Sequence, residues 1–143
     1  MYEHLIVTGK LGILLNTNSP FISVVIPVPL IIWTFAPTIA VPQNDLWGRT
    51  YEGYSENTNL VSDLGKSFIE GLQGTHEDFL GNEKVLATAK HFLGDGGTDQ
   101  GIDQGNTIMS ELSLKKIHGT PYYDAIDSCA LSIMASFNSW NDK

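Results

Sequence analysis

Side chains that could take part in chemistry gather in three polar segments of this 143-residue sequence. The first segment carries Asp45, Trp47, Arg49, Glu52, Tyr54 and Glu56, the second Lys90, His91, Asp95 and Asp99, and the third Asn138, Ser139 and Trp140. Carboxylates and amides can bind the hydroxyl groups of a sugar, cationic groups can hold the same oxygen atoms, and indole rings pack on the apolar ring face. The mixture predicts a site for a polar ligand, and a sugar is one such ligand.

Arg49 is the only arginine in the sequence and stands in a Gly-Arg-Thr-Tyr-Glu segment. Its guanidinium carries a rigid fork of hydrogen-bond donors, so one hypothesis is that it binds a ligand. The alternative is a surface ion pair with Glu52 or Glu56, which would contribute little to stability.

Lys90 and His91 stand near the end of an otherwise apolar run over residues 85–93. In a regular strand their side chains would point to opposite faces, so both can reach one site only if the strand bends or ends here. A histidine at a strand end is also often a core residue that binds no ligand. A buried Lys90 would need a carboxylate partner, for which Asp95 is the candidate.

The spacing of the polar residues excludes several other kinds of site. Asp95, Asp99 and Asp103 lie four residues apart, whereas an EF-hand loop places oxygen ligands at alternate positions and ends in a glutamate. The Gly-Asp-Gly-Gly-Thr segment lacks the spacing of a Walker loop and the third glycine of a dinucleotide-binding loop. No Ser-His-Asp or zinc spacing is present, and we expect no metal ion and no cofactor.

The strands that must position these residues are predicted from apolar runs. Such runs cover residues 31–41, 85–93 and 130–137, and their length and continuity predict strands buried on both faces. The first strand should end near Ala36, because Pro37 cannot donate a hydrogen bond to a sheet. Residues 1–30 resist assignment.

The helices are predicted from periodicity and capping residues. One apolar stripe repeats every four residues at Leu60, Leu64, Phe68 and Leu72, with Val61 and Ile69 beside it. This stripe predicts an amphipathic helix that ends at Gly71 or Gly74 and covers one face of a sheet. Ser110 is the expected N-cap of a second helix, and a further short helix is expected over residues 121–127.

The resulting order, β-α-β-α-β, predicts an α/β fold with a parallel sheet, either an open sheet or a barrel. In both architectures ligands bind at the carboxyl ends of the strands. The three polar segments follow the three predicted strands, so we expect their side chains to gather at one edge of the sheet.

Charge and composition narrow the possible partners. With 16 acidic and 8 basic residues the net charge is −8, which argues against nucleic acid or an anionic membrane as the main partner. Residues 20–42 carry no charge, but three internal prolines argue against a membrane-spanning helix. No signal peptide is recognised. The single cysteine, Cys129, is expected to be a small buried residue.

Five blocks of the sequence, in this order and spacing, resemble glycoside hydrolase family 3. The blocks are Trp47-Gly-Arg-Thr-Tyr-Glu-Gly-Tyr-Ser-Glu56, Gly71-Leu-Gln-Gly74, Ala89-Lys-His-Phe-Leu-Gly-Asp-Gly-Gly-Thr98, Ile117-His118 with Pro121-Tyr122, and Ser132-Ile-Met-Ala-Ser-Phe-Asn-Ser-Trp140. The resemblance covers roughly residues 33–141. It implies a partial (β/α)8 TIM-type barrel with about three β/α units in residues 32–143, preceded by a divergent segment, residues 1–31.

The same resemblance implies a function. Members of the family include β-glucosidases that remove terminal glucose from β-glucans or cello-oligosaccharides by a retaining mechanism, and they are often periplasmic or secreted. By motif position, sugar hydroxyls would be bound by Arg49, Lys90 and His91, while Met134 and Phe137 would line the same pocket. The family's nucleophile would lie beyond Lys143 and its acid/base commonly in a following sandwich domain, so no catalytic residue is expected within the chain.

Departures from the family pattern leave a second hypothesis open. Leu46 replaces a usual arginine, Asn57-Thr58 replaces an Asp-Pro helix start, and Cys129 stands where a glycine commonly ends a helix. A cysteine in a left-handed conformation there would cost up to about 1 kcal/mol. The alternative to a β-glucosidase fragment is a non-catalytic carbohydrate-binding module that keeps Arg49, Lys90 and His91.

Overall fold

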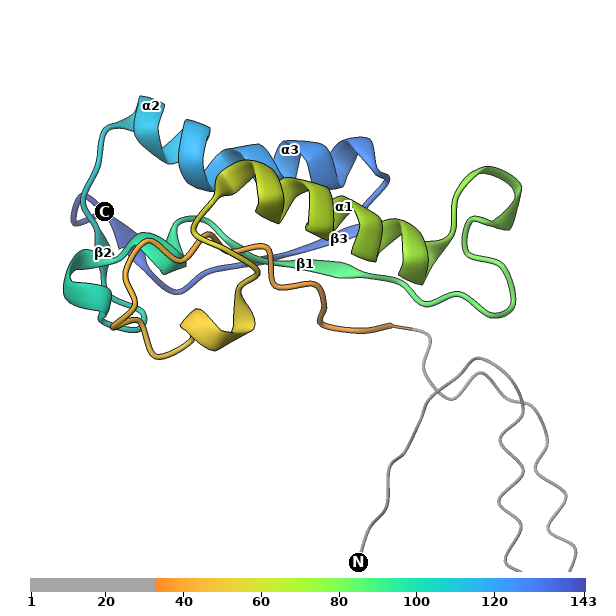
Figure 1. Ribbon diagram of the computed structural model, residues 1–143, viewed down its shortest axis with the longest axis horizontal. Helices are drawn as coiled ribbons and strands as arrows, with labels where there is room; N and C mark the ends of the chain where they lie inside the picture. The colour runs from red at the N-terminus through yellow and green to blue at the C-terminus, as the bar shows by residue number, and fades with distance from the viewer. Residues whose placement is uncertain (1–32) are drawn as a thin grey trace, which may run out of the picture.

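Strand β1 (Thr88–Phe92) lies at the centre of the parallel sheet in the computed structural model, which describes residues 33–143 (Figure 1). On one side β1 pairs in parallel with β3 (Ser132–Ala135). On its other side residues 33–39 run parallel to it, through bridges from Trp33 to Leu86 and from Thr38 to Lys90. Three parallel segments in sequence order confirm the predicted parallel α/β arrangement. The unassigned residues 1–30 and the first part of the uncharged run lie outside the described residues.

The first predicted strand is extended, but its burial on both faces was wrongly predicted. Its pairing continues past Ala36, because the Ile39 N–H donates to the Lys90 carbonyl (2.8 Å) and the Lys90 N–H to the Pro37 carbonyl (3.1 Å). Residues 39–42 are buried, whereas Trp33 is 52% exposed. The helices pack only on residues 39–42. Trp33 is exposed because no element of the described residues covers that end of the strand.

Helix α1 (Thr58–Gln73) has the ends that its capping residues predict. The Asn57 side chain accepts hydrogen bonds from the N–H groups of Asn59 (3.0 Å) and Leu60 (3.2 Å), which satisfies two donors of the first turn. At the other end Gly74 has φ = 77° and ψ = 178°, a backbone conformation with positive φ that glycine adopts at little cost.

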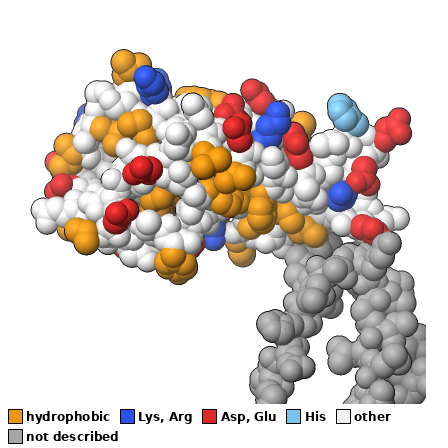
Figure 2. Space-filling view, in the orientation of Figure 1, with side chains coloured by type: hydrophobic (Ala, Val, Ile, Leu, Met, Phe, Trp, Pro, Cys, Tyr) orange, Lys and Arg blue, Asp and Glu red, His pale blue; other side chains and the backbone are white. Residues whose placement is uncertain are grey.

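The buried face of α1 agrees only in part with the predicted stripe. The expected stripe of Leu60, Leu64 and Phe68 is more than 40% exposed and forms an apolar band along this helix in Figure 2. The helix buries Val61 and Ile69, which the prediction placed beside this stripe, and leaves Leu72 half-buried. Between Val61 and Ile69 lies Gly65, which brings the helix so close to the first strand segment that a Cβ there would lie 2.6 Å from Ile39 Cγ2. Backbone proximity at Gly65, and not side-chain size, sets which face points inward.

A continuous helical stretch connects the second and third parallel segments. It comprises α2 (Glu111–Leu114), a π-helical turn (Lys115–Gly119) and α3 (Thr120–Asp127). Ser110 caps it as predicted, with its hydroxyl accepting from the Ser113 N–H at 3.1 Å. The Ile117 carbonyl in the π turn accepts from the Thr58 hydroxyl (3.2 Å), which joins this stretch to α1. Helices α1 and α3 pack together over one side of β1 and β3 (Figure 1).

The buried Gln73 side chain connects the ends of these elements. Its amide nitrogen donates to the Cys129 carbonyl at 2.7 Å, and its carbonyl oxygen accepts from the Ala87 N–H at 3.0 Å. These bonds tie the end of α1 to the start of β1 and to the turn after α3. The apolar core between the helices and the sheet comprises Ile39, Val41, Val61, Ile69, Ala87, Ala89, Tyr122 and Ala125.

The third predicted strand exists, but it is not buried. Along β3 the residues alternate between half-buried and exposed, because β3 pairs only with β1 in the described part of the chain and is therefore an edge strand. The predicted burial of Cys129 is also wrong: its side chain is exposed. Its φ of 63° confirms that the residue ends the helix in a left-handed conformation.

A second, very short sheet was not predicted. Strand β2 (Asn106–Thr107) pairs in parallel with β4 (Ser139–Trp140). Single-turn 3-10 helices cover Thr50–Glu52, His76–Asp78, Asp95–Gly97 and Asp99–Gly101. Among residues 33–143, no helix has the length and apolar character that crossing a bilayer requires.

Candidate functional site

Arg49 and His91 come together at the carboxyl ends of the first two parallel segments. Arg49 precedes the turn Thr50–Glu52, and His91 lies in β1, 42 residues further along the chain. The distance from Arg49 Nη2 to His91 Nε2 is 3.1 Å. This contact confirms that side chains of the first two polar segments gather at one edge of the sheet.

The Arg49 guanidinium is also paired with Glu52. Its Nε donates to Glu52 Oε1 and its Nη2 donates to Glu52 Oε2, both at 2.7 Å. The hydrogen bonds to Glu52 raise the pKa of Arg49, and those from Arg49 lower the pKa of Glu52. The alternative of an ion pair with Glu52 is therefore confirmed. The pair is not isolated, since the same guanidinium reaches His91.

Asp95 holds the other side of the His91 ring. Its Oδ2 lies 2.9 Å from His91 Nδ1, and both residues are buried. A guanidinium can only donate hydrogen bonds, so Nε2 of His91 must accept from Arg49. The remaining ring nitrogen, Nδ1, then carries the proton and donates a hydrogen bond to Asp95. Glu52, Arg49, His91 and Asp95 thus form a continuous hydrogen-bonded chain, which we call the clamp.

An irregularity in β1 places Lys90 and His91 on the same side of the sheet. The pairing register with β3 shifts between Lys90 and Phe92. Before the shift, Ala89 lies in the core beneath the helices, and after it the ring of Phe92, which is 44% exposed, contacts the Tyr122 ring of α3 at a centroid distance of 5.0 Å. The strand is therefore irregular at the position where the hypothesis of a shared site for Lys90 and His91 needs a bend.

Asp95, the candidate partner for a buried Lys90, does not pair with it. Asp95 is directed at His91, and no ion pair of Lys90 is found among residues 33–143. Lys90 is half-buried and needs no direct partner, and its charge contributes to the lowered pKa of Glu52.

The two apolar candidates lie on and after β3. Met134 is the register partner of Lys90 on the neighbouring strand and is half-buried. Phe137 follows β3 and is 83% exposed. Its loop is held at the end of β1, since the Ser136 N–H donates to the Phe92 carbonyl at 2.6 Å. These positions place both residues at the same edge of the sheet as the clamp.

Several other candidate side chains serve the fold and are not free for a ligand. The Asn138 amide donates to the Leu93 carbonyl (3.1 Å) and the Thr107 hydroxyl (3.0 Å), and the Trp140 indole donates to the Met109 carbonyl (2.9 Å). Trp47 is 1% exposed, so its ring face is not available to a sugar. The third polar segment therefore anchors the β2–β4 pair.

Glycines pack the second loop against the first. The Gln43 N–H donates to the Gly96 carbonyl at 2.7 Å. A Cβ on Gly96 would overlap the Val41 carbonyl, and a Cβ on Gly101 would lie 2.6 Å from the backbone nitrogen of Trp47. A polar pocket of about 230 Å³ opens between the two loops and is lined by Gln43, Asn44, Gly97, Thr98, Asp99, Gln100 and Ile108.

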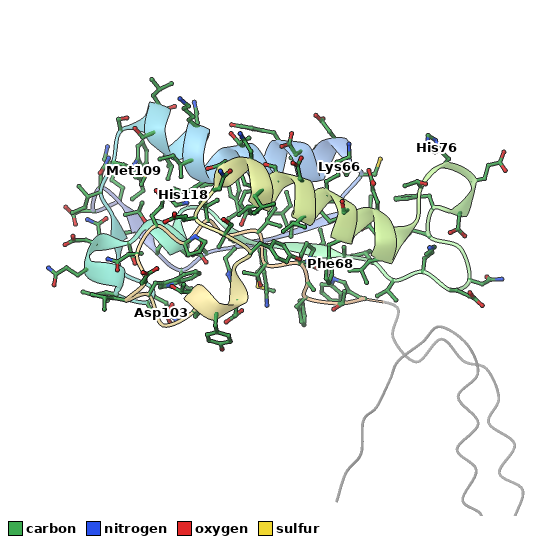
Figure 3. The ribbon with its side chains drawn as sticks, in the orientation of Figure 1. Lys66, Phe68, His76, Asp103, Met109 and His118 are labelled. Atoms are coloured by element: carbon green, nitrogen blue, oxygen red, sulfur yellow. The ribbon has the colours of Figure 1, made fainter. Side chains whose placement is uncertain are left out.

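His118 is a buried residue near the clamp that the sequence did not single out for chemistry. It lies in the interior between the helical stretch and the loops (Figure 3) and is 2% exposed. Burial lowers its pKa to about 4, against a smaller opposing effect of the Asp95 charge. Its only signal in the sequence was its place in the Ile117-His118 block. In the described residues no three His, Cys, Asp or Glu side chains are grouped to hold a metal ion.

Comparison with known proteins shows that this chain is similar to glycoside hydrolases. Residues 30–143 match the glycosyl hydrolase family 3 N terminal domain. A β-xylosidase of Formosa agariphila is 38% identical over 109 residues, which are 75% of this chain and 15% of that protein.

Solved structures agree with the sequence match. The exo-1,3/1,4-β-glucanase of a Pseudoalteromonas species is 52% identical with a TM-score of 0.76, over 78% of this chain and 14% of that one. The β-glucosidase of Listeria innocua in complex with glucose is 29% identical with a TM-score of 0.69, over 76% of this chain and 15% of that one. The chain thus spans about one seventh of the length of the relatives that it matches.

Proposed function

Because the chain belongs to glycosyl hydrolase family 3, through the N-terminal domain of that family, we propose that it is part of a β-glucosidase-type glycoside hydrolase. Its own contribution is to bind the terminal sugar of a β-linked glucoside. The clamp carries this proposal, since Arg49 and His91 come from two different loops and meet at 3.1 Å at the carboxyl ends of parallel strands. That edge is where α/β sheets and barrels bind their ligands.

We further propose that residues 32–143 form about three β/α units of a (β/α)8 barrel, with residues 1–31 as a separate N-terminal segment. The three parallel segments and the two helices packed on one side of them support this arrangement. The exposed edge of β3 and the exposed stripe of α1 are surfaces that neighbouring units of a barrel would cover.

The proposed ligand residues are Arg49, Lys90 and His91 for the sugar hydroxyls, with Met134 and Phe137 at the edge of the same pocket. Nη1 of Arg49 has no protein partner among residues 33–143, so its two N–H groups remain available as donors. The ammonium of Lys90 supplies further donors. The Listeria relative was solved with glucose, which supports glucose as the sugar, while the Formosa relative makes xylose the second candidate.

Hydrolysis with retention requires two carboxyl groups about 5–5.5 Å apart across the scissile bond, one as nucleophile and one as acid/base. We assign neither group to this chain, since Glu52 and Asp95 are both engaged in the clamp. We propose that the remainder of a longer enzyme supplies the pair, in a following part of the barrel and in a sandwich domain.

Titration of the chain with glucose and with xylose in a calorimeter tests the binding role. Arg49→Ala should weaken glucose binding about 10- to 100-fold, because charge-assisted hydrogen bonds are lost. Arg49→Lys keeps the charge without the fork and should recover little of that loss. Lys66→Ala, at an exposed cation on α1, is the control. Equal affinities in all four proteins would refute the proposal.

Hydrolysis of a chromogenic aryl β-glucoside and the matching β-xyloside tests the assignment of the carboxylates. We expect no release of the aryl alcohol by the chain alone. Release that Asp95→Asn reduces would place the catalytic carboxylates within these residues and overturn our assignment.

A further inference from the structure

The side of His91 that faces away from the proposed ligand is held by a carboxylate to which no role has been given. We propose that Asp95 is a positioning residue, which fixes the tautomer of His91 so that the ring accepts a hydrogen bond from Arg49 and holds the guanidinium ready for ligand. This inference rests on the proposed sugar-binding role of Arg49 and His91.

The directions of the hydrogen bonds support the proposal. Arg49 can only donate, and the Asp95 carboxylate can only accept. His91 lies between them, at 3.1 Å from Arg49 Nη2 and 2.9 Å from Asp95 Oδ2. Both contacts form together only when Nδ1 carries the proton and Nε2 does not. The opposite tautomer would bring an N–H group of the ring against an N–H group of Arg49.

The backbone around Asp95 keeps the carboxylate in place. Asp95 follows Gly94, whose φ of 94° turns the chain after β1, and precedes Gly96, which packs on the Val41 carbonyl. The Gly97 N–H closes this turn on the Gly94 carbonyl at 3.0 Å. Asp95 is 5% exposed, and its single side-chain hydrogen bond among the described residues goes to His91. A hydrogen bond between buried groups is electrostatically stronger than one in water, so this bond restrains the His91 ring.

Glu52 acts on the other end of the clamp. It accepts hydrogen bonds from Nε and from one N–H of Nη2 of Arg49, and the other N–H of Nη2 donates to His91. Glu52 and His91 together fix the orientation of the guanidinium plane. The edge of the guanidinium that remains is Nη1.

The charges of the site predict which ligands it selects. Two carboxylates, Glu52 and Asp95, balance the two cations, Arg49 and Lys90, when His91 is neutral. The groups left for a ligand are donors only, on Nη1 of Arg49 and on the Lys90 ammonium. The site therefore suits a ligand with several acceptor oxygen atoms, such as a sugar.

Nitrogen NMR of the ligand-free chain, labelled with ¹⁵N in its histidine rings, tests the tautomer directly. The His91 signals are identified by their loss in His91→Gln. In the wild type we expect a protonated Nδ1 and an unprotonated Nε2 at neutral pH. A protonated Nε2 in the wild type would overturn the proposal without any variant.

Variants at Asp95 then test whether this carboxylate determines the tautomer of His91. In Asp95→Leu the Nδ1 proton loses its acceptor, so we expect the Nε2-protonated form to appear and glucose to bind about tenfold more weakly. Asp95→Glu should keep part of the Nδ1-protonated form and part of the affinity for glucose. Asp63→Leu, at an exposed carboxylate of α1, should change neither the tautomer nor the affinity. An unchanged tautomer in a folded Asp95→Leu chain would refute the role of Asp95. A wild-type chain with the expected tautomer but no affinity for glucose would instead refute the proposed function.

Discussion

Acid should destabilise this chain through one buried side chain, His118. Burial lowers its pKa from 6.5 to about 4 in the folded chain. Between these values the unfolded chain binds a proton that the folded chain does not, so stability is lost as the pH falls through this window. The loss should reach about 2 kcal/mol near pH 5 and about 3 kcal/mol near pH 4, from the standard linkage relation.

Urea unfolding followed by tryptophan fluorescence, at neutral pH and near pH 5, measures this loss. His118→Leu replaces the titrating group by an apolar side chain of similar size. The stability difference between the two pH values should therefore shrink by about 2 kcal/mol. His76→Leu, at an exposed histidine far from His118 in Figure 3, is the matched control and should leave the difference unchanged. A His118→Leu chain as acid-sensitive as the wild type would refute the reasoning.

The remaining predictions concern glycine positions and use the same unfolding assay. Gly65→Ala should destabilise by about 1–3 kcal/mol, because the new Cβ would lie 2.6 Å from Ile39 Cγ2 in a packed core. Gly71→Ala, in the same helix but with no atom within 4 Å, should stabilise by about 0.5–1 kcal/mol, and the reverse order would contradict the packing of α1. Cys129→Gly should stabilise by about 1 kcal/mol by relieving a left-handed φ of 63°, which an unchanged or lower urea midpoint would disprove.

Local sequence signals predicted the elements of the fold but not which faces they bury. The cap at Asn57 and the terminating Gly74 are short-range effects, so the bounds of α1 could be read from the sequence. Which residues of the predicted stripe point inward could not, because that depends on the contact of Gly65 with Ile39, residues from two separate elements. The strands β2 and β4 have two residues each and are too short to show any periodicity.

The candidate site was predictable as a set of residues but not as a network. The lone arginine and the Lys-His pair at a strand end made Arg49, Lys90 and His91 candidates for ligand binding. Their geometry depends on the register shift in β1, which turns His91 toward Arg49, and on the turn at Gly94, which turns Asp95 toward His91 instead of Lys90. Neither irregularity has a signature in apolar periodicity.

The close packing of the two loops through Gly96 and Gly101 has a consequence for the entropy of binding. A loop that becomes ordered only around its ligand loses conformational freedom at that moment, which reduces affinity. Here the backbone of one loop lies directly on the backbone of the other, so that freedom is already lost when the chain folds. A larger residue at either glycine would separate the loops, so part of their order would have to be restored at the moment of binding and affinity at Arg49 and His91 would fall.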